Sequence, residues 1–354
     1  MKLKTILGCG LAVMAQTAWA ESSISFDQAL ACVQDQVPAG AYVRNDLVPS
    51  DADLESITPL SEPVTLKVGL SWVLNAEHAH FYNAIERGYF ADEGIEIELV
   101  PGGPGKNHIQ TLGGGAVDVA VASSGSFIPQ ALTSPTPIDG LVVVGSVLKG
   151  APGALLTIDE ELIGKELTPE DLKGKTVAGG PFLRHLPIML DKAGIDESEV
   201  NVIKAGFAPD ALFAGAADFY FGWIFNQTQV IEDRGHEWNA ILWKDFAFND
   251  YPVSIVMKQE MLDENSEVAK RFMRATYRGL ADVVNDPEGS AEITVKHATD
   301  ATGITKDDVL FRFKNQEFLI TNEGERLLET SLDQWDENAA TLVQYGFFPT
   351  VPCE

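Results

Sequence analysis

The stretch from residue 64 to residue 127, VTLKVGLSWVLNAEHAHFYNAIERGYFADEGIEIELVPGGPGKNHIQTLGGGAVDVAVASSGSF, decides the fold of this chain. Apolar and polar residues alternate over 64–70 and again over 95–100, as is typical of half-buried strands. A helical spacing of apolar residues lies between them over 79–87, and Gly88 ends it. A strand, a helix and a second strand in succession predict a parallel sheet in an α/β protein.

The same pattern continues along the chain. Residues 117–121 form an apolar run typical of a buried strand, and helices are expected over 183–193 and 209–214. Further strands are expected at 141–147, 154–158, 200–204, 218–222 and 251–257, and residues 172–180 are expected to form a loop that leads into a buried strand and then glycines. Because 172–250 repeats the strand and helix order of the first stretch, the sequence predicts two lobes. From residue 264 onward the pattern is helical, and we expect this tail to pack back on the first lobe.

Residues 1–20 are typical of a cleavable signal peptide. Lys2 and Lys4 precede a short apolar core, and AWA at 18–20 is a small-x-small cleavage site. The apolar run is too short to span a membrane. A buried N-terminal helix is the alternative interpretation.

The chain is strongly acidic, with a net charge of −27. Without Lys2 and Lys4, 23 basic side chains face 52 acidic ones, a balance of −29. Such a surface repels nucleic acid and anionic membranes. Together with the leader, this charge suits a soluble exported protein, and we expect no binding to nucleic acid.

Two cysteines, Cys32 and Cys353, remain after the leader is removed. In an oxidising compartment they predict a disulfide between the N-terminal extension and the C-terminus, and two unrelated buried thiols are the alternative. Neither they nor the six histidines have the spacing of a metal site. The extension, residues 21–63, predicts a short helix over 26–33 and then a surface loop.

Five segments in order resemble the periplasmic solute-binding proteins of ABC importers: the leader, SWVLNAEHAHFYNAIERGYFADEGIEIELVPGG, LKGKTVAGG, GAADFYFGWIFNQ and RFMRATYRGLADVVNDPE. The resemblance covers about residues 64–336 and is to the branch shared by thiamine-pyrimidine-precursor, riboflavin, nitrate and sulfonate binders. It implies an α/β, two-lobed type II fold with two crossovers and a ligand cleft between the lobes. Lobe one would comprise 64–164 and 250–354, and lobe two 165–249. It also implies a monomer without a cofactor that delivers its ligand to an ABC permease in the inner membrane.

One relative in this branch is an enzyme, a fungal pyrimidine synthase that uses pyridoxal phosphate and consumes its own residues. By the resemblance, its cofactor lysine falls at Ala122 and its histidine at Ser126. Its cysteine-rich run falls near 249–254, where this chain has no cysteine. These departures favour binding over catalysis, so we expect no enzyme activity.

Candidate ligand contacts in lobe one follow the expected strands, where open α/β sheets bind ligands. Trp72 offers a flat surface for a ring, although it could instead close the lobe. Asn75 can pair with a ring edge. His78 is either a ligand contact or a surface residue, and His80 is expected at the surface. Of Phe81 and Tyr82, we expect one in the cleft and one in the core, and Tyr82 is the cleft candidate.

Two glycine- and serine-containing loops complete the candidates in lobe one. The segment 101–105 resembles an anion cradle, with Gly103 as the candidate contact, but a tight turn at the cleft rim is the alternative. It lacks the Lys and Ser/Thr of a nucleotide P-loop. Ser123, Ser124 and Gly125 follow the buried strand, where hydroxyls and amides can reach a ligand.

In lobe two, Gly179, Trp223, Asn226 and Gln227 are the expected opposite wall. Trp223 could hold a ring against Trp72, with packing at the hinge as the alternative. The expected walls carry aromatic and amide side chains and few basic ones, whereas an anion calls for Arg, Lys or several amides. The sequence thus favours a flat heteroaromatic ligand: a thiamine-precursor pyrimidine first, riboflavin second, and an oxyanion or sulfonate third.

Overall fold

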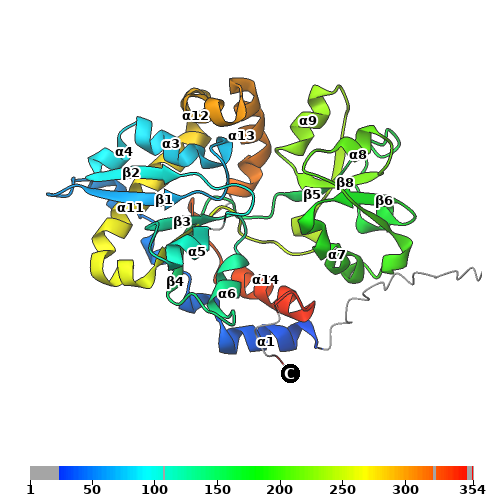
Figure 1. Cartoon of the computed structure of the whole chain (residues 1–354), viewed down its shortest axis with the longest axis horizontal. Coiled ribbons are helices and arrows are strands. Elements are labelled where there is room, and N and C mark those ends of the chain that lie inside the picture. Colours follow the sequence, from blue (N-terminus) through cyan, green and yellow to red (C-terminus); the bar gives the residue numbers. More distant parts are fainter. Residues whose placement is uncertain (1–23, 107, 322–323, 349–352, 354) are drawn as a thin grey trace, which may run out of the picture.

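The computed structural model describes residues 24–348, apart from 107 and 322–323, together with residue 353. Two five-stranded sheets lie side by side, each with its own helices, and connecting segments run between them (Figure 1). This arrangement confirms the α/β class and the two lobes. The predicted signal peptide lies outside the described residues.

The first sheet has the order β2-β1-β3-β10-β4. Its strands are β1 (Val64–Gly69), β2 (Ile95–Val100), β3 (Val119–Ala122), β4 (Leu141–Ser146) and β10 (Ser254–Lys258). Strand β1 is parallel to β2 and β3, whereas β10 is antiparallel to β3 and β4. The four residues of β3, VAVA, are all buried, as expected for an apolar run in the middle of a covered sheet.

The second sheet repeats this arrangement with the order β7-β6-β8-β5-β9. Its strands are β5 (Gly153–Thr157), β6 (Thr176–Gly179), β7 (Asn201–Lys204), β8 (Phe219–Trp223) and β9 (Asn239–Leu242). Strand β6 is parallel to β7 and β8, and β5 is antiparallel to β8 and β9. In each sheet the antiparallel strand is the first one formed after the chain crosses over, so there are two crossovers, as expected.

The expected boundary between the lobes near residue 164 is wrong. It left the strand at 154–158 in lobe one, but β5 is paired between β8 and β9 in the second sheet. The chain therefore crosses after Ser146, the end of β4, and not near 164. The sequence could not place this strand, because the apolar run GALLT indicates burial on both faces and not which sheet covers it.

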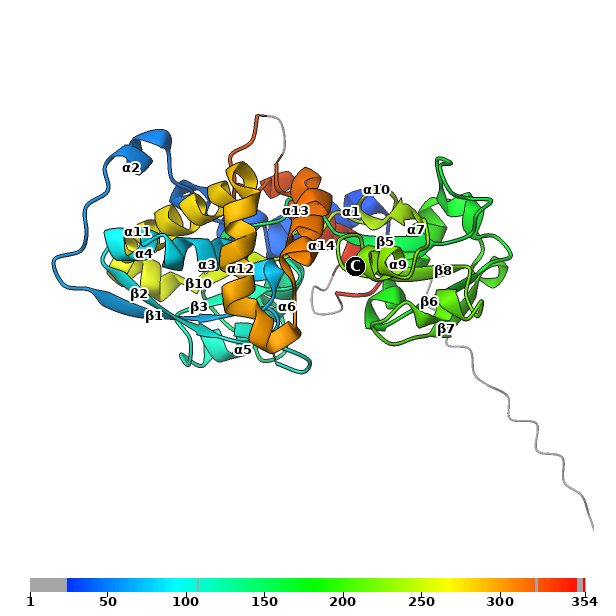
Figure 2. The same cartoon turned by 90° about the horizontal axis from the view of Figure 1, so that it is seen from above.

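Helices surround both sheets (Figures 1 and 2). Those of the described residues are α1 (Phe26–Gln36), α2 (Asp51–Glu55), α3 (Ala79–Glu86), α4 (Tyr89–Asp92), α5 (His108–Gly113), α6 (Phe127–Leu132), α7 (Leu186–Lys192), α8 (Asp210–Phe213), α9 (Gln227–Asp233), α10 (Trp243–Phe246), α11 (Gln259–Asn285), α12 (Pro287–Thr302), α13 (Lys306–Ile320) and α14 (Leu332–Gln344). Helices α11 and α12 both pack against α3, so much of the tail returns to the first lobe. Because α3 lies under them, its side chains have little access to water.

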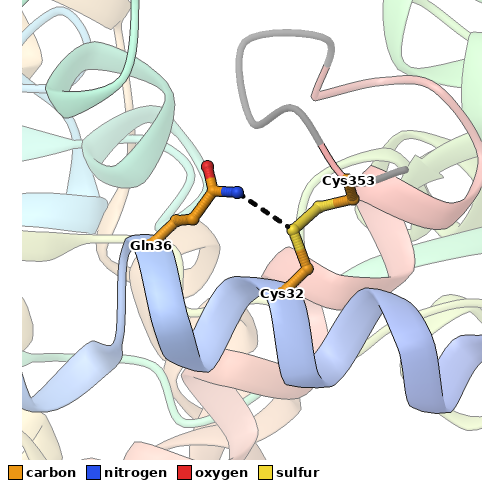
Figure 3. Close-up of a disulfide and its surroundings, with 3 residues drawn as sticks. All are labelled: Cys32, Gln36 and Cys353. Atoms are coloured by element: carbon orange, nitrogen blue, oxygen red, sulfur yellow. Dashed lines mark hydrogen bonds between the residues drawn. A yellow bond between two sulfur atoms is a disulfide. The ribbon is translucent and has the colours of Figure 1, made fainter.

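The N-terminal extension is more deeply packed than a surface loop. Val43 pairs with Val143 of β4, and its neighbours Tyr42, Leu47 and Val48 are buried. Helix α1 packs against α14, and a disulfide joins Cys32 of α1 to Cys353 (Figure 3). The predicted disulfide is thus confirmed, and it ties the two ends of the described chain together.

The described helices include none with the length and apolar character that a membrane span requires.

Candidate ligand-binding site

A cavity of about 260 Å³ lies between the two lobes, at the carboxyl ends of strands from both sheets. Its walls come from the segments that follow β1, β3, β6, β7 and β8, which is where open α/β sheets bind ligands. The lining residues are Trp72, Asn75, Glu77, Ser123, Gly180, Pro181, Gly206, Phe207, Tyr220, Phe221, Gly222, Trp223, Asn226 and Gln227.

Six of the expected contacts line this cavity. They are Trp72, Asn75, Ser123, Trp223, Asn226 and Gln227. The first three come from the first lobe and the last three from the second, so the structure brings the two expected walls together.

The aromatic ring opposite Trp72 is Phe207. Their ring centroids are 6.2 Å apart with the planes inclined at 60°. Phe207 follows β7 in the second lobe and is 67% exposed. Trp223 also lines the cavity, and its ring packs edge-on against Phe225, with centroids 5.6 Å apart. Phe207 was missed in the sequence, where an isolated Phe after a polar strand carries no periodic signal.

The side-chain amides that line the cavity differ in which of their hydrogen-bonding groups remain free for a ligand. Gln227 accepts a 2.7 Å bond from the backbone N–H of Trp223 and donates a 3.0 Å bond to the carbonyl of Phe207. Both the oxygen and the NH₂ group of this amide are thus used, and they join the backbone at Trp223 to the backbone at Phe207. Asn75 caps the short 3₁₀ helix η3 (Ala76–His78), since its Oδ1 accepts a 2.9 Å bond from the N–H of Glu77. Its NH₂ group makes no hydrogen bond to the described residues, so it is free to donate to a ligand in the cavity that Asn75 lines.

Asn226 is oriented by an arginine from the other lobe. Arg312 of α13 donates from Nη1 to Oδ1 of Asn226 at 2.8 Å, and its guanidinium lies 4.1 Å from the ring centroid of Phe225. Since a guanidinium can only donate, the oxygen of the amide must face it and the NH₂ group must face away. Burial lowers the pKa of Arg312 to about 10, although the nearby Glu77 opposes that shift, so it stays charged at neutral pH.

Glu77 is the one charged side chain among the described residues that line the cavity. It is only 7% exposed, and its Oε1 accepts a hydrogen bond from the hydroxyl of Ser71. Burial raises the pKa of this carboxyl, and Arg312 and Ser71 oppose the rise. Glu77 was also missed, although it stands two residues after Asn75, at the start of the helix that follows the expected binding loop.

Two expected contacts, one at the end of η3 and one on α3, do not reach the cavity. His78 and Tyr82 are fully buried. Burial lowers the pKa of His78 to about 3, so its ring is neutral. Tyr82 stacks on His297 of α12, with ring centroids 4.9 Å apart. The expectation that one of Phe81 and Tyr82 faces the cleft is wrong, because α3 is covered by α11 and α12 and both residues lie in the core.

His80 is likewise buried, at 1% exposed, and not on the surface as expected. Its pKa is well below the usual range because of burial and the neighbouring His78. The helical spacing of α3 marked one apolar face, but packing on its remaining faces comes from helices about 200 residues later, which local periodicity does not show.

Apart from Ser123, the expected contacts in the glycine- and serine-containing loops lie beside the cavity. The hydroxyl of Ser124 donates to the buried carboxyl of Asp250, in a smaller space of about 60 Å³ next to the main cavity. Gly125 packs against Trp335, where an added Cβ would lie 2.6 Å from the indole ring. Gly179 packs against Phe221 and does not line the main cavity.

Gly103 lies in a turn that supports the Trp72 loop. The N–H of its neighbour Gly102 donates a 2.9 Å bond to the carbonyl of Trp72. A Cβ on Gly102 would lie 2.2 Å from the carbonyl oxygen of Leu70, so only glycine permits this approach. The turn holds the Trp72 loop from behind, and Gly103 is not among the residues that line the cavity.

Within the described residues, no group of three His, Cys, Asp or Glu side chains could hold a metal ion. The cavity therefore offers aromatic faces, amide donors and one carboxyl group. These are groups that bind and orient a small molecule.

Two lobes of equivalent topology, joined by two crossovers around a polar and aromatic cavity, define a protein with the periplasmic binding protein fold. The chain belongs to the NMT1/THI5 like family, which matches residues 75–291. The resemblance inferred from the sequence is thus confirmed at the level of family and fold.

Several characterised proteins are similar to this chain. The formylaminopyrimidine-binding protein of Halalkalibacterium halodurans is 28% identical over 67% of this chain and 72% of its own length. The riboflavin-binding protein RibY of Chloroflexus aurantiacus is 24% identical over 72% of this chain and 71% of its own length. The 4-amino-5-hydroxymethyl-2-methylpyrimidine phosphate synthase of Legionella pneumophila is 23% identical over 67% of this chain and 74% of its own length. Among solved structures, the periplasmic aliphatic sulphonate binding protein SsuA from Escherichia coli has a TM-score of 0.54 at 16% identity, over 72% of this chain and 84% of that one.

Proposed function

We propose that this chain is the extracytoplasmic solute-binding protein of an ABC importer and that it captures a small, flat heteroaromatic ligand, with a thiamine-precursor pyrimidine as the first candidate. The observation that carries this proposal is the cavity between the lobes, in which Trp72 of one lobe faces Phe207 of the other. With their centroids 6.2 Å apart these two rings already contact each other, so a ligand ring would lie against the pair inside the cavity and would contact both lobes only when they are closed. Such a ligand stabilises the closed state by its greater affinity for it.

The lining suits a flat ring with polar edges. Trp72, Phe207, Phe221 and Trp223 supply aromatic surface, and aromatic faces attract other flat rings in offset or edge-to-face arrangements. Asn75 and Asn226 present amide N–H groups beside these rings, which gives the ligand's edge partners of fixed direction.

The size of the cavity favours one ring over three. Its 260 Å³ lies just below the range of about 300–1,000 Å³ typical of sites for drug-sized ligands. A substituted pyrimidine matches this volume better than a flavin with its ribityl chain. Riboflavin remains the second candidate because of the relative named for it, and it would require the lobes to open wider.

An anionic ligand is less well supported. The charged side chain that lines the cavity is the carboxyl of Glu77, which repels an oxyanion, and Arg312 lies behind Asn226, where Nη1 is already used. The pyrimidine-synthase alternative rests on the similarity to the Legionella protein. Against it, Ala122 and Ser126 stand where the resemblance places the synthase lysine and histidine.

The proposed place of action is the periplasm, with an ABC permease in the inner membrane as the partner and a monomer as the working form. The signal-like residues 1–20 support export, and the Cys32–Cys353 disulfide is typical of an oxidising compartment.

Thermal-shift screening and calorimetric titration with 4-amino-5-hydroxymethyl-2-methylpyrimidine, riboflavin, taurine and nitrate test this proposal. We expect the pyrimidine to raise the melting temperature most. Stabilisation by taurine or nitrate alone would overturn the heteroaromatic proposal. Incubation with pyridoxal phosphate, followed by absorbance spectroscopy, tests the alternative class, because a lysine adduct would indicate an enzyme.

A further inference from the structure

Glu77 is a carboxyl group in an otherwise uncharged, aromatic cavity. It is fixed there by its place in η3, directly after the Asn75 cap, and by the hydroxyl of Ser71 on its Oε1. Its second oxygen, Oε2, accepts no hydrogen bond from the part of the chain that the structure describes. Oε2 is not among the described side-chain atoms that are both closed to solvent and without a partner, so in the cavity it is open to a donor on a bound ligand.

The neighbouring amides do not satisfy Glu77, and their orientation is fixed. The Oδ1 atoms of Asn75 and Asn226 are bonded to the N–H of Glu77 and to Arg312, respectively, so both amides present donors. The cavity thus combines one acceptor, Glu77, with two donors. A complementary ligand presents at least one N–H group to Glu77 and ring nitrogens or other acceptors to the amides.

The carboxyl group of Glu77 further limits which ligands are complementary to the cavity. A carboxyl group binds strongly to two neighbouring nitrogens of a ligand. One N–H group donates to one carboxyl oxygen, and the second nitrogen shares a proton with the other oxygen. An exocyclic amino group next to a basic ring nitrogen supplies that pair. A carbonyl oxygen in the same place would face the carboxyl oxygen, and the two acceptors would repel each other.

Resting on the proposed function, we propose that Glu77 is the specificity-determining residue of this cavity and selects rings that carry an amino group beside a basic ring nitrogen over rings that carry a carbonyl group there. The amino group donates to Oε2, the ring nitrogen shares the proton of the acid, and Asn75 and Asn226 donate to the remaining acceptors. No bond other than hydrogen bonds is formed or broken.

The test uses two rings that differ only at this edge, 4-amino-2-methylpyrimidine and 2-methylpyrimidin-4-one. Their dissociation constants are measured by calorimetry with the wild-type protein, Glu77→Gln and the matched control Glu62→Gln, which removes an exposed carboxyl of the same lobe. We expect the wild type and the control to prefer the amino ring by about tenfold or more. Glu77→Gln should abolish or reverse the preference, because its carboxamide can donate to a carbonyl.

The outcomes of this experiment distinguish the role of Glu77 from the proposed function. An unchanged amino-to-oxo ratio in Glu77→Gln, or equal binding of both rings by the wild type, would overturn the role of Glu77 and leave the proposed function standing. Failure of the wild type to bind either ring would overturn the role of Glu77 and the pyrimidine as the first candidate ligand. If Glu77→Gln does not fold, Glu77→Asp serves instead: it keeps the acid but shortens the side chain, and it should weaken binding of the amino ring only.

Discussion

Arg312 Nη1 donates a 2.8 Å hydrogen bond to Oδ1 of Asn226, and this bond joins helix α13 to the segment after β8 in the second lobe. A second contact from α13, between Asp308 and Gln229 of α9, lies beside it. In Figures 1 and 2, α13 stands at the side of the first lobe that faces α9. The bond therefore has two effects: it orients a cavity amide and it holds the lobes together.

Replacing Arg312 by methionine should weaken ligand binding about tenfold, or ~1.4 kcal/mol, because Asn226 loses the bond that orients it. The free protein should also lose stability, because the substitution leaves Gln316 without the bond that its Oε1 accepts from Nε of Arg312 and leaves the buried Glu77 without a nearby positive charge. Calorimetry and thermal unfolding measure the two effects. Lys314→Met, an exposed position on the same helix, is the control, and equal affinities in the two variants would contradict the prediction.

The aromatic wall makes a second prediction. Trp72→Ala should weaken ligand binding by about 2 kcal/mol, as for a central aromatic contact, and Phe207→Ala by about 1 kcal/mol. Because Phe207 is 67% exposed, its removal should leave the melting temperature of the free protein nearly unchanged. Trp238→Ala is the control, since Trp238 bonds to Glu232 outside the cavity. Loss of affinity in Trp238→Ala equal to that in Trp72→Ala would mean that the effect is structural.

Much of this fold could be predicted from alternation and turn residues. The limits expected for β2 match the structure, and those for β1 and β7 differ by a single residue. Strand β9 was missed, and β5 was assigned to the wrong lobe, because short apolar runs do not specify their pairing partners.

The site was harder to predict than the fold. Trp72 and Trp223 could be proposed because they follow expected strands, and both line the cavity. His78 and Tyr82 could not be excluded, because the helices that bury them come from the far end of the chain. Arg312 illustrates the same limit, since it is 86 residues from the amide it orients.

The disulfide provides a third prediction. Cys32 and Cys353 are separated by 321 residues, so their bond restricts a long loop of the unfolded chain. Cys32→Ser with Cys353→Ser should lower the free energy of unfolding by about 2–4 kcal/mol, measured by urea denaturation. Ligand affinity should be unchanged, because neither cysteine lines the cavity. The wild-type protein under reducing conditions should behave like the double variant, and a double variant as stable as the oxidised wild type would contradict the prediction.

Asp250 predicts how stability depends on pH. Burial raises the pKa of its carboxyl above the usual value, although bonds from Ser124 and the Ser126 N–H oppose the rise. As the pH rises from about 3.9, the unfolded chain loses this proton before the folded protein does. The folded state then binds more protons, so this group's contribution to stability falls with rising pH until the folded pKa is passed.

Asp250→Asn keeps the shape of the side chain and removes the titration. Its free energy of unfolding, relative to the wild type, should therefore increase as the pH is raised above 4, by urea denaturation at a series of pH values. Asp333→Asn, at an exposed position on α14, is the control for the loss of one carboxyl group. A difference between Asp250→Asn and the wild type that is constant with pH would contradict the assignment.

Val253 makes the last prediction, which concerns the segment that returns the chain to the first lobe. Its φ is +59°, which is unusual for a β-branched residue, and its side chain is buried. Its carbonyl accepts a 3.2 Å bond from the N–H of Val147, where the first crossover begins, so both connecting segments meet at this strained residue. Glycine normally destabilises a protein relative to alanine, but at positive φ it relieves a strain of about 1–2 kcal/mol. Val253→Gly should therefore be more stable than Val253→Ala, by thermal unfolding, whereas the same pair at the buried strand residue Val144 should show the ordinary order. If alanine is the better substitute at both positions, the return segment stores no backbone strain at Val253.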